Sequence, residues 1–152
     1  MGLQQIGFGI RDDLRNNITD PINRKKEGGG EWIHYDRLKN PSKTPQIYIN
    51  KAPSGRQQDT TGGGKIHFYN YLVQIVFKDG DRGISPSGDS NVIITDDDEL
   101  RDATAECIID RLETARIAIS GAEVFNFVSH DGDFNLTDDK IVTTLRYEAQ
   151  KK

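Results

Sequence analysis

The chain has 152 residues, of which 29% are charged, and it carries a formal net charge of −4 and a single cysteine. No apolar run approaches the roughly 18 residues of a membrane-spanning helix, and the acidic total disfavours a dedicated nucleic-acid-binding protein. One cysteine excludes an internal disulfide or a multi-cysteine zinc site, and the first residues lack the pattern of a secretory signal. We therefore expect a single domain over residues 1–152, made in the cytoplasm and without a membrane partner.

The charge is distributed unevenly along the chain. Residues 1–76 carry 11 Lys and Arg against 7 Asp and Glu, a balance of +4, whereas residues 77–152 carry 9 against 17, a balance of −8. Surfaces of opposite charge attract copies of one protein head to tail. A chance distribution of a small number of charged residues explains the difference between the two halves equally well.

The N-terminal segment predicts a helix over residues 3–18. Apolar side chains recur there at steps of three and four residues, at Leu3, Ile6, Ile10, Leu14 and Ile18. The helix should end before Pro21, because proline disfavours the helical conformation of the residue that precedes it. The polar, glycine-rich residues 23–31 predict a loop.

Strand patterns dominate the next part of the chain. Residues 32–35 predict a short edge strand, and residues 45–50 alternate as a second strand. The polar, glycine-rich residues 52–64 predict a long flexible loop. Residues 66–78 give the strongest strand, with a core face formed by its odd-numbered residues and a mixed opposite face. Residues 79–91 predict another open loop.

A second helix is predicted from about Asp97 to Arg116. Thr95 or Asp96 caps its start, where the acidic residues that follow interact favourably with the positive end of the helix. Helical periodicity places one set of side chains on the buried side: Leu100, Ala103, Cys107, Ile108, Leu112 and Ala115.

The C-terminal part predicts two further strands, at residues 123–129 and 140–148, and the dipeptide Asp131-Gly132 between them is typical of a hairpin turn. The element order is then α-β-β-β-α-β-β. Two separated helices packed on a mainly antiparallel sheet make a two-layer α+β fold.

Two glycine- or aspartate-containing motifs are weak candidates for ligand sites. Gly62 to Lys65 resembles part of a phosphate-binding loop, but Ile66 stands where that motif requires Ser or Thr. The motifs Asp79-x-Asp81 and Asp131-x-Asp133-x-Asn135 resemble the start of a calcium-binding EF-hand loop. That loop requires Gly at its sixth position and Glu at its twelfth, and counting from Asp131 these positions hold Leu136 and Val142. Turn formation explains both better.

Other residue types also give no catalytic pattern. His34, His67 and His130 are scattered without the spacing of a zinc site, and Cys107 lies in the predicted buried arc, where a free cysteine is usually inert. We therefore predict no catalytic, cofactor or metal site, and no enzymatic activity.

The most unusual constellation is an acidic stripe on the second helix, formed by Asp102, Glu106, Asp110 and Glu113. Like charges at this spacing slightly destabilise an isolated helix. The stripe has three alternative interpretations. It is simply exposed to solvent, it meets a basic surface of a partner, or it lines a passage through which DNA must move without binding. Arg111 falls beside the apolar arc, so it should pair with a carboxylate of another subunit or of its own chain.

This layout resembles the tail terminator and head–tail joining (tail completion) proteins of tailed viruses, which are small α+β proteins that form a ring, typically of six. The similarity covers most of the chain and lies in the order of its predicted elements. These are the helix through Ile18, the segment Gly30–Tyr35, the strand Pro45–Ile49, the long loop up to Gly64, the strand ending Val73–Phe77, the helix from Asp97 and the hairpin to Tyr147.

The resemblance implies a structural protein of the virion, assembled in the host cytoplasm. It would cap the tail tube as a ring, join it to the neck, and let DNA pass without specific binding. The loops at 52–64 and 79–91 would contact neighbouring virion proteins. Two alternatives remain open: another viral part, such as a neck, tail-completion or tail tube protein, or a cytoplasmic ligand-binding module.

Overall fold

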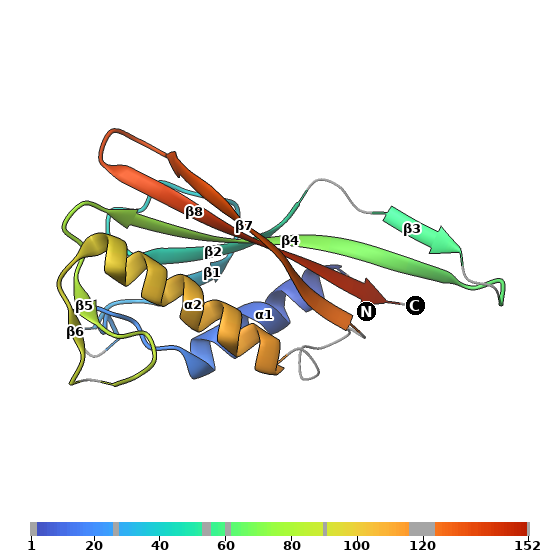
Figure 1. The fold of residues 1–152 in the computed structure, drawn as a ribbon, viewed down its shortest axis with the longest axis horizontal. Helices are drawn as coiled ribbons and strands as arrows, with labels where there is room; N and C mark the ends of the chain where they lie inside the picture. Colours follow the sequence, from blue (N-terminus) through green and yellow to red (C-terminus); the bar gives the residue numbers. More distant parts are fainter. Residues whose placement is uncertain are drawn as a thin grey trace.

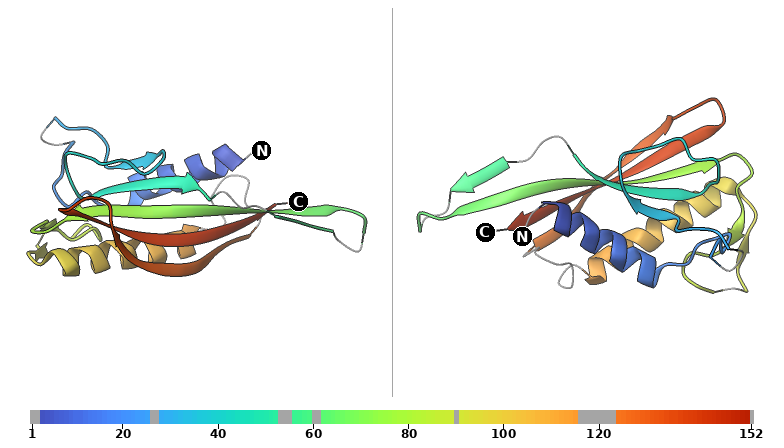
Figure 2. Two further views of the ribbon diagram at one scale, coloured as in Figure 1. Left: turned by 90° about the horizontal axis from the view of Figure 1, so that it is seen from above. Right: turned by 180° about the vertical axis from the view of Figure 1, so that it is seen from behind.

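The fold consists of two helices packed on one face of a mainly antiparallel sheet, as the sequence predicts (Figure 1). The computed structural model describes residues 3–25, 28–52, 56–59, 62–89, 91–115 and 124–151. The right-hand view of Figure 2 shows both helices on the same side of the strands, and both contribute to one core cluster with the same sheet face. Among the described elements, no helix covers the opposite face.

The main sheet is built around one long strand. Its members are β1 (Ile33–Tyr35), β2 (Gln46–Lys51), β3 (Arg56–Asp59), β4 (Lys65–Lys78), β7 (Val124–Asn135) and β8 (Lys140–Lys151). Their order is β1-β2-β4-β8-β7, with β3 paired to the part of β4 that β2 does not reach. The pair β1–β2 is parallel and the other pairs are antiparallel. The hairpin of β3 and β4 therefore projects beyond the helices (Figure 1).

Helix α1 (Leu3–Asn17) packs under β1 and β2, and helix α2 (Asp97–Ala115) packs under β4 and β7. The predicted apolar stripe is confirmed at Ile6, Ile10 and Leu14, which are fully buried, and Ile18 is buried just after the helix ends. The side chain of Leu3 lies outside the described part of the structure. Asp96 caps α2, because its carboxylate accepts hydrogen bonds from the backbone N–H groups of residues 98 and 99. In the described part of the chain, neither helix is long and apolar enough to cross a membrane.

The core lies between the helices and the odd-numbered face of β4, where Tyr71, Val73 and Ile75 are fully buried. The opposite face is mixed, as predicted. It holds a small apolar cluster around Val76 and Val142, and beside it Gln74 bridges Asn50 and the neighbouring strand β8.

Two predicted loops contain short strands. The range 52–64 includes β3, which pairs with β4 although its polar residues show no apolar alternation. The range 79–91 includes β5 (Gly83–Ile84), which pairs with β6 (Ile93–Ile94). The open edge of a neighbouring strand, rather than apolar patterning, explains β3. Residues 53–55, 60–61 and 90 of these loops lie outside the described part of the chain.

The predicted hairpin turn at Asp131-Gly132 is wrong. β7 continues to Asn135 through two bulges, one of which lies between Asp131 and Phe134. The reversal occurs at residues 136–139, where the carbonyl of Lys140 accepts hydrogen bonds from Leu136 and Thr137. Arg146 of β8 binds the carboxylate of Asp131 at 2.6 Å, which holds this dipeptide within the paired strands.

Candidate functional site

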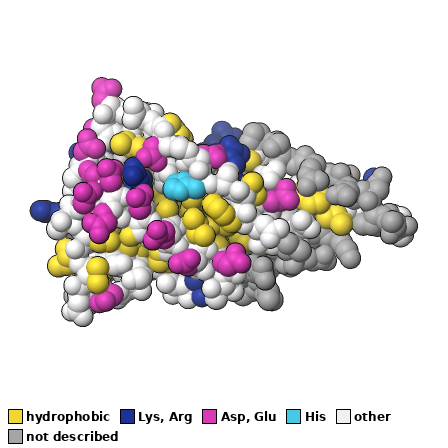
Figure 3. All heavy atoms as spheres, in the orientation of Figure 1, with side chains coloured by type: hydrophobic (Ala, Val, Ile, Leu, Met, Phe, Trp, Pro, Cys, Tyr) yellow, Lys and Arg dark blue, Asp and Glu magenta, His cyan; other side chains and the backbone are white. Residues whose placement is uncertain are grey.

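The four predicted acidic residues of α2 share its exposed side. All four side chains of this group, which we call the acidic face, are exposed: Asp102, Glu106, Asp110 and Glu113. The whole helix contains seven Asp and Glu against two Arg, a balance of −5. Figure 3 shows many more acidic than basic side chains over this part of the surface. The helix thus presents a strongly negative surface to its surroundings.

Neither arginine of α2 neutralises the middle of this face. Arg101 turns toward the sheet, where its guanidinium lies 2.5 Å from Asp133 and over the ring of Phe77, while it also contacts Asp102 at 3.1 Å. Among the described residues, no cation lies within 4.0 Å of the carboxylates of Glu106 or Asp110. These two charges are therefore the least compensated of the four.

Arg111 has an internal partner, which was one of the two alternatives that its position predicted. Its Nε and Nη2 atoms lie 3.0 and 2.8 Å from the two carboxylate oxygens of Asp13 on α1. These hydrogen bonds raise the pKa of Arg111. The pair fastens the two helices together, and the Arg111 charge is already matched within one chain.

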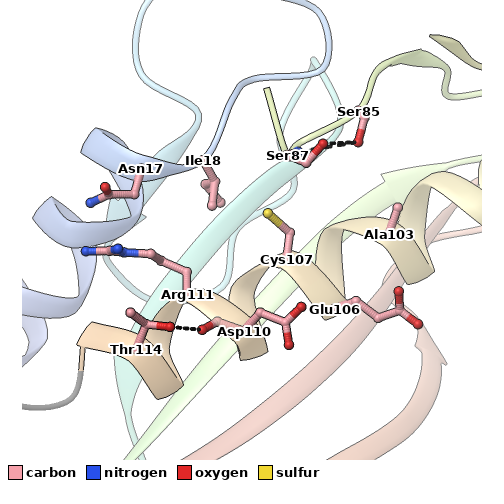
Figure 4. A pocket seen from close by; sticks show the side chains of 10 residues that line it. All are labelled: Asn17, Ile18, Ser85, Ser87, Ala103, Glu106, Cys107, Asp110, Arg111 and Thr114. Carbon is pink, nitrogen blue, oxygen red and sulfur yellow. Dashed lines mark hydrogen bonds between the residues drawn. The ribbon is translucent and has the colours of Figure 1, made fainter. Parts of the chain in front are cut away.

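A groove of about 470 Å³ runs between the end of α1, the segment around β5 and one side of α2 (Figure 4). Arg111 points toward α1, whereas Cys107 points toward the serines of the β5 segment. Ser85 and Ser87 hydrogen-bond to each other at 2.9 Å. The groove is open and its lining is mixed, with Glu106 and Asp110 among the lining residues.

Cys107 lies in the wall of this groove and is half-buried rather than fully buried as predicted. Burial, and then the nearby charge of Asp110, raise the pKa of the Cys107 thiol. The thiol is therefore protonated at neutral pH, which disfavours a role as a nucleophile.

The other sequence motifs do not converge on one place. Lys65 begins β4, so Gly62 to Gly64 lead into a strand and not into the helix that a phosphate-binding loop requires. The carboxylate of Asp81 accepts hydrogen bonds from Thr44 and from the backbone of Lys78. Asp131 and Asp133 are held by arginines, which is consistent with structural roles.

The three histidines lie on separate strands. His34 stacks on Tyr48, His67 stacks on Tyr69, and His130 hydrogen-bonds to Thr143 at 2.8 Å. Burial, followed by the charge of Arg15, lowers the pKa of His34. His130 belongs to β7, next to the Asp131-Gly132 pair that was predicted to form a turn. Within the described residues, one group of three acidic side chains lies close enough to share an ion, namely Asp96–Asp98, and its first member caps α2.

Sequence reasoning missed several exposed apolar side chains at the sheet edge and on the β5–β6 ribbon: Val92, Ile93, Phe127, Val128 and Phe134. Three of them belong to β7, whose bulges disturb the regular alternation of inward and outward residues. The sequence signal for their exposure was therefore weak.

No protein-family model matches the sequence, and a search of curated proteins finds no relative.

Proposed function

We propose that this chain is a structural virion protein at the head–tail junction of a tailed virus. Copies would form a ring, of six by the resemblance described above, that caps the tail tube, joins it to the neck and lets DNA pass. The α+β fold and its element order agree with the layout on which that resemblance rests. In this proposal the protein has no catalytic role.

The observation that carries the proposal is a separation of charge across the molecule. The acidic face belongs to α2, which packs under β4 and β7. The segment that joins β1 to β2 carries three exposed cations, Arg37, Lys39 and Lys43, of which Lys39 pairs with Asp36. This segment passes over the sheet face opposite the helices, where Leu38 packs on the Val76–Val142 cluster. Opposite charges on opposite sides favour a head-to-tail contact, and such contacts generate closed rings when the rotation permits.

The projecting hairpin of β3 and β4 gives further support. Its outer part extends beyond both helices (Figure 1), and among the described elements β3 has substantial contacts with β4 alone. A surface arm of this kind has little to pack against within its own chain. In a ring or on a tail tube, a neighbouring subunit would supply that contact.

Native mass spectrometry of the full chain over a concentration series, at low and at moderate salt, tests the proposal. We expect a discrete symmetric oligomer that dissociates as salt rises, because exposed ion pairs are screened. A strict monomer under all conditions, also in the presence of purified tail tubes, would contradict it. A continuous tube in place of a single ring would instead favour a tail tube protein.

The acidic face has two possible places in such a ring, and one set of variants separates them. Replacing Asp102, Glu106, Asp110 and Glu113 by Lys should abolish the oligomer if the face meets the basic segment of a neighbour. If the face lines the DNA passage, rings should still form but particles should retain or stall DNA, because phosphates would bind the new cations. Intact rings with normal DNA passage would exclude both roles.

A further inference from the structure

A second cavity, distinct from the groove beside α2, lies at the sheet edge where β1 ends. It measures about 560 Å³ and lies between Phe8 of α1, residues 35–37 at the end of β1, and residues 49–51 at the end of β2. β2 continues past the last residue of β1, so the cavity lies where the outermost strand of the sheet stops.

The backbone of β2 is open at this point. Asp36 N–H donates to the carbonyl of Ile49 at 3.0 Å, which is the last hydrogen bond between this edge and β1. The N–H of Ala52 points to the opposite side of the strand and donates to the backbone carbonyl of Asn70 in β4 at 2.8 Å. Because successive residues of a strand direct their backbone groups to alternate sides, the N–H and C=O of Lys51 point away from β4. Within the described residues, neither group has a backbone partner.

The cavity beside this open edge has an aromatic wall. Phe8 contacts the ring of Tyr35 edge-on, with 5.1 Å between ring centres. The Tyr35 ring lies directly over Gly7, where any added Cβ would overlap it. Both rings are half-buried, so they form an apolar surface that this chain alone leaves partly open.

The rim of the cavity is positive. Arg37 and Lys51 are exposed, and neither side chain has an ion pair among the described residues. The carboxylate of Asp36 is already bound by Lys39 and by the backbone of Arg37. An acidic group that approaches the open edge would therefore meet two free cations.

From this arrangement we infer that the edge beside Lys51 binds an extended segment of a partner protein as an added β-strand. The segment continues the line of β1, exchanges backbone hydrogen bonds with Lys51, inserts an apolar side chain against Phe8 and Tyr35, and places acidic side chains near Arg37 and Lys51. Open strand edges with adjoining side-chain pockets recognise peptides in this way. The inference does not depend on the proposed ring.

The test uses the full chain, labelled with ¹⁵N, and a synthetic nonapeptide, acetyl-Asp-Glu-Val-Thr-Leu-Thr-Val-Glu-Asp-amide. Two control peptides isolate the two parts of the inference. One replaces every acidic residue by Lys, and the other carries N-methyl groups on alternate residues, which removes the N–H groups needed for strand pairing. We expect the first peptide to shift the amide signals of Tyr35, Lys51 and Ala52, and both controls to bind at least about tenfold more weakly.

A matched pair of variants tests the backbone role of Lys51. Lys51→Pro removes the outward N–H without removing a hydrogen bond to β4, and Lys51→Gln removes the charge but keeps the N–H. We expect Lys51→Pro to weaken binding at least about tenfold, and Lys51→Gln to weaken it less than about fivefold. If Lys51→Pro does not fold, the N-methylated peptide provides the same comparison on the unaltered protein.

Three results would overturn the inference. The first is the absence of any shift at about 1 mM peptide. The second is equal binding of the N-methylated peptide, which would show a pocket that takes side chains without strand addition. The third is a concentration-dependent shift of the Lys51 amide without peptide, which would assign this edge to a second copy of the chain.

Discussion

Arg111 of α2 and Asp13 of α1 form a two-point ion pair that links the helices across 98 positions of sequence. Asp13 is 12% exposed and Arg111 is 30% exposed, so solvent screens the pair only in part. Each charge depends on the other, because removal of one would leave its partner unpaired at the helix interface.

We therefore expect Arg111→Ala to lower the free energy of unfolding by about 1 to 3 kcal/mol, since it leaves the Asp13 carboxylate without its partner. Asp13→Asn should have a smaller effect, and the double variant should be more stable than the sum of the two single changes predicts. Urea unfolding of the four proteins gives the coupling energy directly. Strictly additive effects would show that the pair contributes nothing beyond its separate side chains.

Gly7 gives a prediction whose sign depends on its neighbour. Alanine normally stabilises a helix interior relative to glycine by about 1 kcal/mol. At Gly7, however, the new methyl group would overlap the Tyr35 ring, so Gly7→Ala should destabilise the protein by about 1 to 3 kcal/mol. In a Tyr35→Ala background the same change should be neutral or stabilising. Thermal unfolding of both pairs checks this, and destabilisation of equal size in both backgrounds would contradict it.

The elements found from sequence are those whose burial leaves a periodic signal. α1, β4 and β8 each direct one regular face to the core, and Asp96 caps α2 by a local hydrogen bond that needs no tertiary information. β3 and β5 lack such a face and form because another strand offers an open edge. The Asp131-Gly132 pair failed as a turn signal because contacts with β8 keep it inside a bulged strand.

The candidate sites were only partly predictable for the same reason. Helical spacing places all four acidic residues of α2 on the exposed side, and it also identifies Arg111 as a charge that needs a partner. That Asp13 is this partner depends on how two distant helices pack. The cavity beside Lys51 depends on where β1 stops relative to β2, which no local pattern of residues records.

The lowered pKa of His34 predicts a loss of stability in mild acid. Burial, followed by the charge of Arg15, lowers this pKa below the unfolded value of about 6.5. Between the two values the unfolded chain binds more protons than the folded chain, so the free energy of unfolding falls as the pH drops below about 6.5.

Urea unfolding at a series of pH values checks this, with His34→Gln as the comparison. The variant should lose part of the decrease seen below about pH 6.5, whereas His67→Gln, on a different strand, controls for the removal of a histidine. Identical pH profiles for the unaltered protein and His34→Gln would exclude this contribution.

Charge exchange between the two sides of the molecule tests the proposed head-to-tail contact. Glu106→Lys with Asp110→Lys reverses the two least compensated charges of the acidic face, and should dissociate the oligomer by placing cations against the Arg37 segment. Asp79→Lys with Asp138→Lys makes the same change in net charge at exposed turns, and should leave the oligomer intact.

Adding Arg37→Glu and Lys39→Glu to the first variant should restore assembly, because the attraction returns with its direction exchanged. Native mass spectrometry reads all four proteins at one concentration and salt. If the Asp79→Lys, Asp138→Lys control dissociates the oligomer as well, the effect comes from net charge and not from the acidic face. If Arg37→Glu and Lys39→Glu do not restore assembly, the acidic face meets some other surface.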